Sequence, residues 1–342
     1  MITDVGNFFI FGFDGTSVPA SLKMLSKKHG LGGVILFGRN VESPEQLRRL
    51  TAQLHSLSPS GPLIISIDQE GGKLQRLKPP YFTAFPPACK VTPLTALDLG
   101  RRMGQELADL GINVDFAPVL DVNSNPHNPI IGDRSFGSDP QFVADVGKLF
   151  IKGLQERGVL ACGKHFPGHG DTDQDSHMTL PIVNQPIKRL YNVEIFPFKE
   201  LIGFGLKAIM TAHVLYPTLD KENPATFSQN ILCKILRKKL GFEGLIVTDD
   251  MGMAGALSQA DLPDACVQAF AAGCDLLLVS EHYDRHEEII AFLEKSIHKS
   301  ETLKKRAYES FERLRRSLVT FKSYGKRCGP IFNSFMSPPR TP

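Results

Sequence analysis

The feature that most constrains the fold is a set of eight short apolar runs, spread along the chain and separated by segments of helical character. The runs are FFIFGF (8–13), GVILF (33–37), LIISID (63–68), INVDFAPV (112–119), LACGKHF (160–166), KAIMTAHV (207–214), GLIVTDD (244–250) and DLLLVS (275–280). Apolar strands that alternate with helices are typical of a parallel sheet covered by helices, and eight such strands can close into a barrel. The sequence therefore predicts an α/β fold, a single-domain (β/α)8 barrel of the TIM type.

The segments between these runs carry the signals of helix starts and ends. SPEQLRRLTAQLHSL begins with Ser43 as N-cap followed by proline, and DPQFVADVGKLFIKGLQERG begins in the same way with Asp139 and ends at Gly158. SQNILCKILRKKLG (228–241) and LPDACVQAFAAG (262–273) also have glycine at the far end. These signals predict helices that return the chain from one strand to the next.

A doubly wound open sheet is the alternative arrangement for the same elements. It is disfavoured because FGFDGTS follows the first strand, where a dinucleotide-binding sheet would carry a Gly-rich fingerprint. No internal repeat or long linker divides the chain. We therefore expect one barrel domain over residues 1–325, followed by a Pro-rich and poorly ordered tail over residues 326–342.

Composition and charge argue against several classes of partner. The 342 residues are 42% hydrophobic and 22% charged, as in soluble globular proteins, and a net charge of +3 is too balanced to favour nucleic-acid binding. The N-terminus has no basic leader and no apolar run of membrane-spanning length. Six scattered cysteines without a CxxC pair indicate reduced thiols. We expect a cytoplasmic monomer without nucleic-acid or membrane partners.

The basic residues that cluster late in the chain share their segment with an apolar stripe at helical spacing. The stripe consists of Leu303, Ala307, Phe311, Leu314, Leu318 and Phe321. Because such a stripe faces the core, we expect the charges to lie on the solvated face of an amphipathic helix rather than on a nucleic-acid-binding surface.

Charged and polar residues end five of the eight predicted strands. They are Asp68, Asp121, Lys164 with His165, His213, and Asp249 with Asp250. Such groups are costly to bury unless they are partnered, and catalytic groups of a barrel lie at the C-terminal ends of its strands. The convergence predicts an active site at that end, with Asp121 bracing its floor and His213 either in its wall or behind the residues that line it.

The loop KHFPGHGDTDQDSH after the fifth strand first suggests a metal site, because it holds three histidines and three aspartates. It lacks the HxH and HExxH spacings of zinc sites. Its DTDQDS start imitates a calcium loop, but Ser176 and Ile182 stand where that loop needs glycine and glutamate. A metal-dependent barrel hydrolase with ligands from separate strands remains an alternative.

A proton-transfer role accounts for more of this loop. Asp175 and His177 are two residues apart, so in an extended segment they point to the same side. A carboxylate that bonds one ring nitrogen leaves the other free to exchange a proton. Gly168 and Gly170 would allow the loop to move over a substrate. The nucleophile must then come from another strand.

Several motifs in fixed order resemble the single-domain bacterial glycoside hydrolases of family 3, the NagZ-type β-N-acetylhexosaminidases. They are GGVILFGRN, IDQEGGKLQRL, DFAPVLDV followed by IGDRSFGSDP, KHFPGHGDTDQDSHMTLP, MTAHVLYP and GFEGLIVTDDMGM. The resemblance implies retaining two-step hydrolysis without a cofactor. It also implies a carbohydrate substrate, N-acetylglucosamine (GlcNAc) linked β-1,4 to 1,6-anhydro-N-acetylmuramic acid (anhydroMurNAc), cut during peptidoglycan recycling in the cytoplasm.

The resemblance also implies roles for individual residues. Asp249 would be the nucleophile, and Asp175 with His177 the acid/base dyad. The residues expected to hold the non-reducing sugar are Asp68, Arg76, Arg134, Lys164 and His165. Asp250 is expected instead to cap the helix that follows.

Some alternatives stay open. Arg76 could be a surface arginine, and Arg134 could equally form a structural salt bridge. A β-glucosidase-like or phosphorolytic family 3 enzyme would carry the same motifs, and a silent sugar-binding protein would bind GlcNAc without turnover. The sequence departs mildly from the family pattern at Lys73, Leu74 and Met251.

Overall fold

The computed structural model describes residues 4–58, 63–176, 178–258 and 260–327, with side chains up to residue 317. In this part of the chain the predicted eight-stranded parallel barrel is confirmed. Its strands are β1 (Phe9–Phe11), β2 (Gly33–Leu36), β3 (Ile64–Ile67), β6 (Val114–Asp115), β7 (Leu160–Phe166), β8 (Ala208–Thr211), β9 (Leu245–Val247) and β10 (Leu277–Val279). They follow the order β10-β1-β2-β3-β6-β7-β8-β9, and all paired neighbours are parallel.

The barrel closes between β9 and β10 through a few isolated contacts. Val247 and Leu276 form a parallel bridge, and the Thr248 N–H donates to the Leu276 carbonyl at 3.0 Å. The Met251 N–H donates to the Leu278 carbonyl at 2.8 Å. An open doubly wound sheet would leave these two strands as separate edges, so this seam excludes that alternative.

The strands are shorter than the apolar runs that predicted them. The run over 112–119 contributes the two-residue strand Val114–Asp115 and an isolated parallel bridge between Val119 and Lys164. After β3 the chain forms a small antiparallel hairpin, β4 (Gln69–Gly71) and β5 (Leu74–Gln75), instead of entering a helix at once. This hairpin places side chains at the C-terminal end of the barrel.

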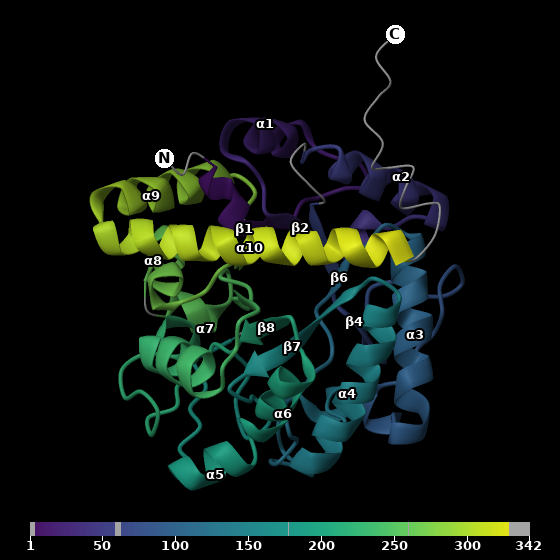
Figure 1. Ribbon diagram of the computed structural model, residues 1–342, viewed down its shortest axis with the longest axis vertical. Helices are drawn as coiled ribbons and strands as arrows, with labels where there is room; N and C mark the ends of the chain where they lie inside the picture. Colours follow the sequence, from purple (N-terminus) through teal and green to yellow (C-terminus); the bar gives the residue numbers. More distant parts are fainter. Residues whose placement is uncertain (1–3, 59–62, 177, 259, 328–342) are drawn as a thin grey trace.

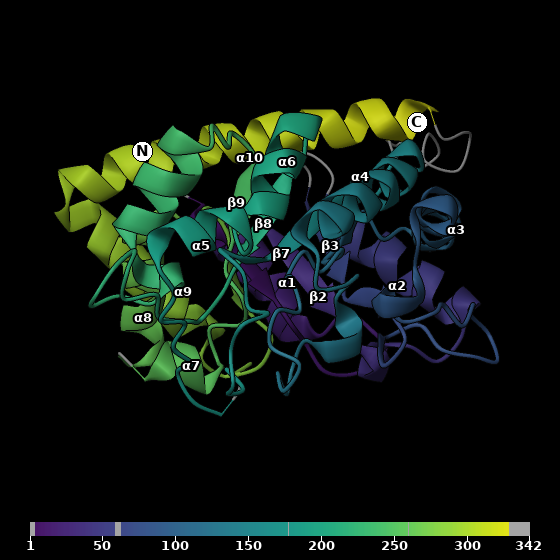
Figure 2. The same cartoon turned by 90° about the horizontal axis from the view of Figure 1, so that it is seen from below.

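Helices surround the strands (Figure 1, Figure 2). They are α1 (Ala20–His29), α2 (Pro44–His55), α3 (Pro93–Asp109), α4 (Pro140–Glu156), α5 (Ile187–Asn192), α6 (Phe196–Phe204), α7 (Ala254–Leu257), α8 (Leu262–Ala272), α9 (His286–Lys299) and α10 (Glu301–Arg327). The predicted N-caps are confirmed, because Ser43 accepts from the Gln46 N–H at 3.1 Å and Asp139 from the Phe142 N–H at 2.7 Å. The helix predicted over 228–241 is present as a π-helical segment, Asn230–Lys239.

Helix α10 lies across the molecule, over the N-terminal end of the barrel (Figure 1, Figure 2). It packs on α8, α9, β9 and the short turn Val5–Phe8 that leads into β1. In the predicted apolar stripe Ala307 and Leu314 are buried, but Phe311 is 41% exposed, so that part of the expected stripe is wrong. Because α10 covers this end, an active site must open at the opposite end.

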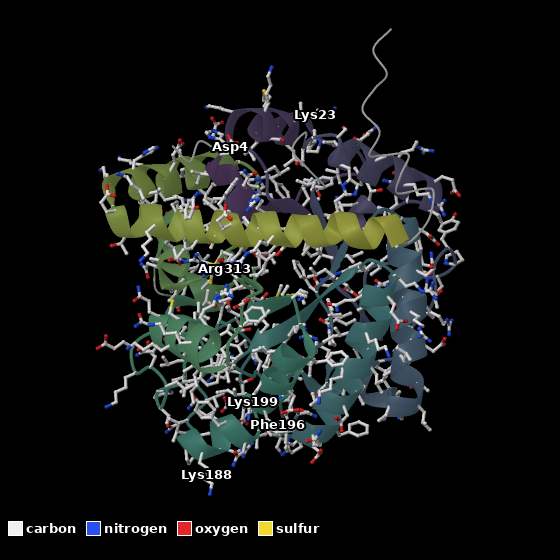
Figure 3. All side chains as sticks on the ribbon, viewed as in Figure 1. Asp4, Lys23, Lys188, Phe196, Lys199 and Arg313 are labelled. Atoms are coloured by element: carbon white, nitrogen blue, oxygen red, sulfur yellow. The ribbon has the colours of Figure 1, made fainter. Side chains whose placement is uncertain are left out.

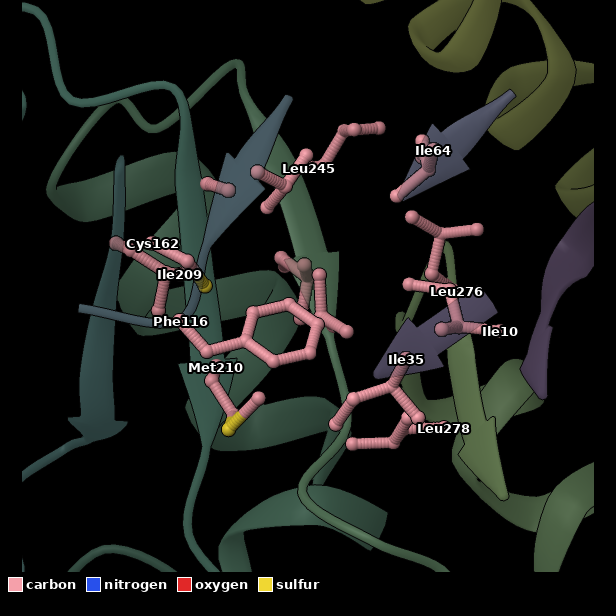
Figure 4. Close-up of a cluster of buried hydrophobic side chains, with 14 of the residues drawn as sticks. Ile10, Ile35, Ile64, Phe116, Cys162, Ile209, Met210, Leu245, Leu276 and Leu278 are labelled. Carbon is pink, nitrogen blue, oxygen red and sulfur yellow. The ribbon is translucent and has the colours of Figure 1, made fainter. Parts of the chain in front are cut away.

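Apolar side chains fill the interior of the barrel (Figure 4). Ile10, Ile35, Phe116, Met210 and Leu278 come from five different strand regions and are all buried. The barrel is therefore a packed core rather than a channel. Charged residues nominated for the site stand at the C-terminal ends of the strands, with Lys164 and His165 near the end of β7 and with Asp68 and Asp249 just beyond β3 and β9.

Charged side chains are present at the periphery. Lys23 and Lys188, on α1 and α5, project from the edge of the molecule (Figure 3). No helix in the described ranges has both the length and the hydropathy required to span a membrane. The proposed tail begins at residue 326, inside α10, and its residues beyond Arg327 lie outside the described part of the chain.

Candidate active site

A pocket of about 670 Å³ opens at the C-terminal ends of the strands. Seven residues that the sequence nominated for the site line this pocket: Asp68, Arg76, Arg134, Lys164, His165, Asp175 and Asp249. They come from the ends of β3, β7 and β9 and from the hairpin and loops that follow the strands. Of the other residues that the sequence placed at this end, Asp121 and His213 are buried and are not among the described residues that line the pocket, and His177 lies outside the described residues.

Five charged side chains of alternating sign form a chain along the pocket. Arg134 donates from Nε and Nη2 to the two carboxylate oxygens of Glu70, each at 2.9 Å. Lys164 Nζ lies 2.6 Å from Glu70 Oε1 and 2.8 Å from Asp68 Oδ1. Arg76 Nη2 completes the chain at 3.1 Å from Asp68 Oδ2. All five side chains line the pocket, so the cluster presents fixed donors and acceptors suited to sugar hydroxyls.

The members of this chain keep one another ionised. Burial alone would raise the pKa of the Asp68 carboxyl, but Lys164 and Arg76 hold that pKa well below its usual range. Glu70 behaves in the same way beside Lys164 and Arg134, which hold its pKa below its usual value. Burial alone would lower the pKa of Lys164, whereas the two carboxylates raise it above its usual value. The charges therefore persist although the side chains are buried.

Glu70 is the member of the chain that sequence reasoning missed. It stands two residues after Asp68, so in extended backbone the two side chains point to the same side. That alternation in IDQEGG was the available signal. Gln69, between them, accepts from the N–H groups of Arg76 (2.9 Å) and Leu77 (3.1 Å), which fixes the hairpin and so the position of Arg76.

His165 stands between two carboxylates. Its Nδ1 lies 2.7 Å from Asp121 Oδ2, and its Nε2 lies 4.0 Å from Asp249 Oδ2. Asp121 Oδ1 accepts from the N–H groups of His165 (3.1 Å) and His169 (2.6 Å). Asp121 is fully buried and braces the end of β7, in agreement with the role that the sequence predicted for it.

Asp249 and Asp250 occupy different environments although they are neighbours. Burial alone would raise the pKa of Asp249, but His165, His213 and the Asp250 N–H hold it below its usual value. Burial raises the pKa of Asp250, whose carboxylate accepts from the Gly252 N–H (3.0 Å) and from the Ser280 hydroxyl. Asp249 is thus the more readily ionised of the two.

The prediction that Asp250 caps the next helix is wrong. Its carboxylate fixes the turn after β9 to the end of β10, through Gly252 and Ser280. The N-cap of α7 is Met253, which has no side-chain cap. Two residues of tight turn separate Asp250 from the N-cap, a spacing that the TDD pattern alone does not reveal.

Comparison with known proteins identifies the family. Residues 15–317 match the model for the glycosyl hydrolase family 3 N terminal domain. The chain belongs to glycoside hydrolase family 3. The beta-hexosaminidase of Nitrosomonas eutropha is 40% identical over 290 residues, which cover 82% of each chain, and that of Thiobacillus denitrificans is 40% identical over 274 residues, 77% and 75% of the two chains.

Solved structures give the same result for this family 3 protein. NagZ from Neisseria gonorrhoeae, in complex with N-trifluoroacetyl-D-glucosamine, superimposes with a TM-score of 0.78 at 31% identity, covering 94% of this chain and 98% of that one. The family 3 beta-N-acetylglucosaminidase of Paenibacillus sp. str. FPU-7 has a TM-score of 0.89 at 38% identity, covering 95% of this chain but 63% of that one. The protein is a NagZ-like β-hexosaminidase, and therefore a glycoside hydrolase.

The loop after β7 is held at its base in this β-hexosaminidase. His169 lies between Thr172 Oγ1 (2.8 Å from Nδ1) and Ser176 Oγ (3.0 Å from Nε2), and burial with the nearby His165 lowers its pKa to about 4. The Ser176 carbonyl accepts from the Gly255 N–H at 3.0 Å. The loop that carries Asp175 is thus anchored to the barrel on either side of that residue.

Gly170 is required for close packing at the base of the loop. The freedom of movement that the sequence suggested for this loop stays a prediction. A Cβ at this position would lie 1.8 Å from the carbonyl oxygen of Val122, so only glycine fits. Gly168 has a φ of +138° and a Cβ there would lie 2.7 Å from the Glu194 side chain. Both glycines are therefore required by the packing of the loop base.

The His213 side chain is held by two hydrogen bonds. His213 lies 2.9 Å from Thr226 Oγ1 through Nδ1 and 3.0 Å from the Asp250 carbonyl through Nε2. Within the described ranges, which leave out His177, no three His, Cys, Asp or Glu side chains form a group that could hold a metal ion.

Proposed function

We propose that this β-hexosaminidase is a retaining exo-β-N-acetylglucosaminidase that removes non-reducing GlcNAc from β-1,4-linked anhydroMurNAc muropeptides. The reaction proceeds through a covalent glycosyl–Asp249 intermediate and requires no metal or cofactor. We place it in peptidoglycan recycling in the cytoplasm, on the resemblance to NagZ-type enzymes. Binding of N-trifluoroacetyl-D-glucosamine by the gonococcal NagZ supports recognition of a 2-acylamino sugar.

The observation that carries this proposal is the setting of Asp249 in the pocket. Its Oδ1 accepts from the Asp250 N–H at 2.8 Å, and its Oδ2 lies 4.0 Å from His165 Nε2. An ionised carboxylate at the C-terminal end of a barrel strand, beside a cluster of sugar-binding type, has the properties of a nucleophile.

The chemistry follows two steps. Asp249 attacks the anomeric carbon while His177 donates a proton to the leaving oxygen, so the glycosidic bond breaks as the ester to Asp249 forms. His177 then takes a proton from water, which attacks the same carbon and releases the carboxylate. Asp175 orients His177. A neutral imidazole repels the ionised Asp249 less than a second carboxylate would.

The alternating charges provide the sugar subsite in this proposal. Asp68 accepts hydrogen bonds from hydroxyls, while Lys164, Arg134 and Arg76 donate to them. Since these groups hold one another in place before substrate arrives, little ordering is left for the binding step. The protein has no tryptophan, so polar contacts dominate recognition.

Trapping tests the nucleophile. A 2-acetamido sugar with a 5-fluoro substituent and a good leaving group accumulates the covalent intermediate, and digestion followed by mass spectrometry locates the label. We expect the label on the peptide containing Asp249. A label on any peptide without Asp249 would remove the assignment.

The acid role of His177 is tested with leaving groups of different quality. His177→Ala should lose about 10²–10⁴-fold in rate on a disaccharide with a poor leaving group, and far less on an activated aryl β-N-acetylglucosaminide. Equal losses on both substrates would contradict proton donation.

Three alternatives are separated by further assays. Faster turnover in phosphate than in phosphate-free buffer would indicate phosphorolysis. Comparable kcat/KM values for the aryl β-glucoside and the aryl β-N-acetylglucosaminide would indicate a β-glucosidase-like enzyme. Full activity after exhaustive chelation, with no bound zinc, would exclude a metal-dependent hydrolase.

A further inference from the structure

Glu70 lies between Arg134 and Lys164 in the pocket cluster and has no role in the reaction scheme above. It lies in the middle of β4, and its side chain is 4% exposed. It also lines the pocket beside Asp249. A buried carboxylate at this position requires partners, and the identity of these partners suggests what it does.

Both partners of Glu70 are cations nominated to bind the sugar. Arg134 engages both carboxylate oxygens in a bidentate pair at 2.9 Å, and Lys164 contacts Oε1 at 2.6 Å. Bidentate geometry fixes the plane of a guanidinium as well as its distance. Glu70 therefore sets the orientation of Arg134 and restrains the flexible stem of Lys164.

Glu70 also sets the charge of the cluster. Arg134, Lys164 and Arg76 carry three positive charges against the two carboxylates of Asp68 and Glu70. Replacing Glu70 by a neutral residue of the same shape leaves Arg134 and Lys164 adjacent and without the carboxylate between them. Like charges at such a distance repel strongly in a buried site, so both side chains should turn away from their present positions.

We propose that Glu70 is a positioning residue that aims Lys164 and Arg134 at the hydroxyls of the non-reducing sugar and fixes the charge of that subsite. The assignment rests on the proposed function, in which these two cations hold the sugar. It predicts that Glu70 acts on binding of the sugar, whereas a purely structural carboxylate would act on folding alone.

Two variants separate shape from charge. Glu70→Gln keeps the length of the side chain and removes the charge, and Glu70→Asp keeps the charge and withdraws it by one methylene. Asp275→Asn is the matched control, because Asp275 is a buried carboxylate with three arginine partners outside the pocket. The measurements are KM and kcat on an aryl β-N-acetylglucosaminide, and the dissociation constant of GlcNAc by calorimetry.

For Glu70→Gln we expect kcat/KM to fall about 10- to 100-fold, mainly through KM, with a parallel weakening of GlcNAc binding. Glu70→Asp should recover part of the loss. The extra positive charge in Glu70→Gln should also favour anions, so the affinity ratio of GlcNAc to its analogue with a carboxylate at C6 should shift toward the acid by about 10-fold. Asp275→Asn should leave KM, the dissociation constant of GlcNAc and the affinity ratio unchanged.

KM and GlcNAc affinity within twofold of wild type in Glu70→Gln would overturn the proposal, as would a loss confined to kcat. If Glu70→Gln does not fold, unchanged binding in Glu70→Asp overturns it as well. A failure of the Glu70 proposal can be told apart from a failure of the proposed function, because GlcNAc binding is measured without turnover. A trap label away from Asp249 removes the nucleophile assignment but leaves the test of Glu70 intact.

Discussion

Each end of the barrel has a cluster of basic side chains around buried carboxylates, two at the C-terminal end and one at the N-terminal end, but the two clusters differ in what lies beside them. At the C-terminal end Asp68 and Glu70 alternate with three cations along an open pocket. At the N-terminal end Asp275, just before β10, meets Arg237, Arg306 and Arg313. Helix α10, which supplies two of those arginines, covers that end (Figure 1).

The bonding within the closed cluster explains why it serves the fold. Asp275 is fully buried, and its Oδ1 accepts from Arg306 Nη2 at 2.9 Å, Arg313 Nη1 at 3.2 Å and Ser310 Oγ at 2.8 Å. Burial alone would raise the pKa of Asp275, but Arg237 and the other arginines hold it below its usual value. The cluster fastens α10 to the barrel, and its charges are directed at one another. Similar chemistry thus forms a clamp at the covered end and lines an open pocket at the other.

The largest effect should come from breaking the closed cluster. Asp275→Asn leaves three arginines around a neutral amide, and we expect the free energy of unfolding to fall by about 3–5 kcal/mol. Urea titration measures this change, while KM on the aryl substrate should stay within about twofold of wild type. A raised KM in a variant of unchanged stability would mean that the two ends are not separate in function.

The converse experiment is made at the open end. Arg76→Lys keeps the charge but loses the planar fork that reaches Asp68 and lies over the Phe37 ring, 4.9 Å from its centroid. We expect kcat/KM to fall about 10-fold. Because Arg76 is partly exposed, the free energy of unfolding should change by less than about 1 kcal/mol. If the free energy of unfolding falls by more than the loss of kcat/KM expressed as a free energy, Arg76 is a structural residue.

The smallest effect concerns Asp115, a carboxyl buried within the barrel wall. Its Oδ1 accepts from the Gln69 N–H at 3.0 Å, and its Oδ2 has no hydrogen-bond partner among the described residues. Burial raises the pKa of Asp115 well above its usual value, despite the Gln69 N–H. The stability that follows from this raised pKa is fully present below the unfolded value of about 3.9, and it is lost as pH rises through the folded value.

The amide introduced by Asp115→Asn cannot ionise, so this variant should be at least as stable as wild type at about pH 7. Its advantage should grow over the pH range above the unfolded value of about 3.9, as the wild-type carboxyl loses the stability linked to its proton. Urea titrations of both proteins across that range measure the difference. A destabilised variant whose deficit is independent of pH would show that the acid proton of Asp115 makes a necessary contact.

The apolar runs and the polar residues that end them were sufficient to predict much of this molecule. The eight strands, the barrel and the location of the pocket follow from them, because alternating strands and helices have few ways to bury their apolar surface. Asp68, Lys164, His165 and Asp249 were recognisable because charged residues at the ends of buried strands need partners.

Predictions from local sequence patterns were less accurate where the deciding contact joins segments that are distant in the sequence. Phe311 fits the apolar stripe of α10 but is exposed, because the spacing of a helix defines a face without its width. Asp250 fits a helix cap but binds Ser280, 30 residues away. The first error concerns how wide the buried face of the helix is. The second concerns a partner that the neighbouring sequence does not contain.

The sequence by itself determined the eight barrel strands and which residue types lie at their C-terminal ends. Only the tertiary structure decided how those charges pair: Glu70 with Arg134 and Lys164, Asp121 with His165, and Asp249 rather than Asp250 as the more readily ionised neighbour. The reason is geometric. Ionic pairing depends on distances of a few ångströms between side chains from separate strands, and these distances are fixed by the register of the closed barrel.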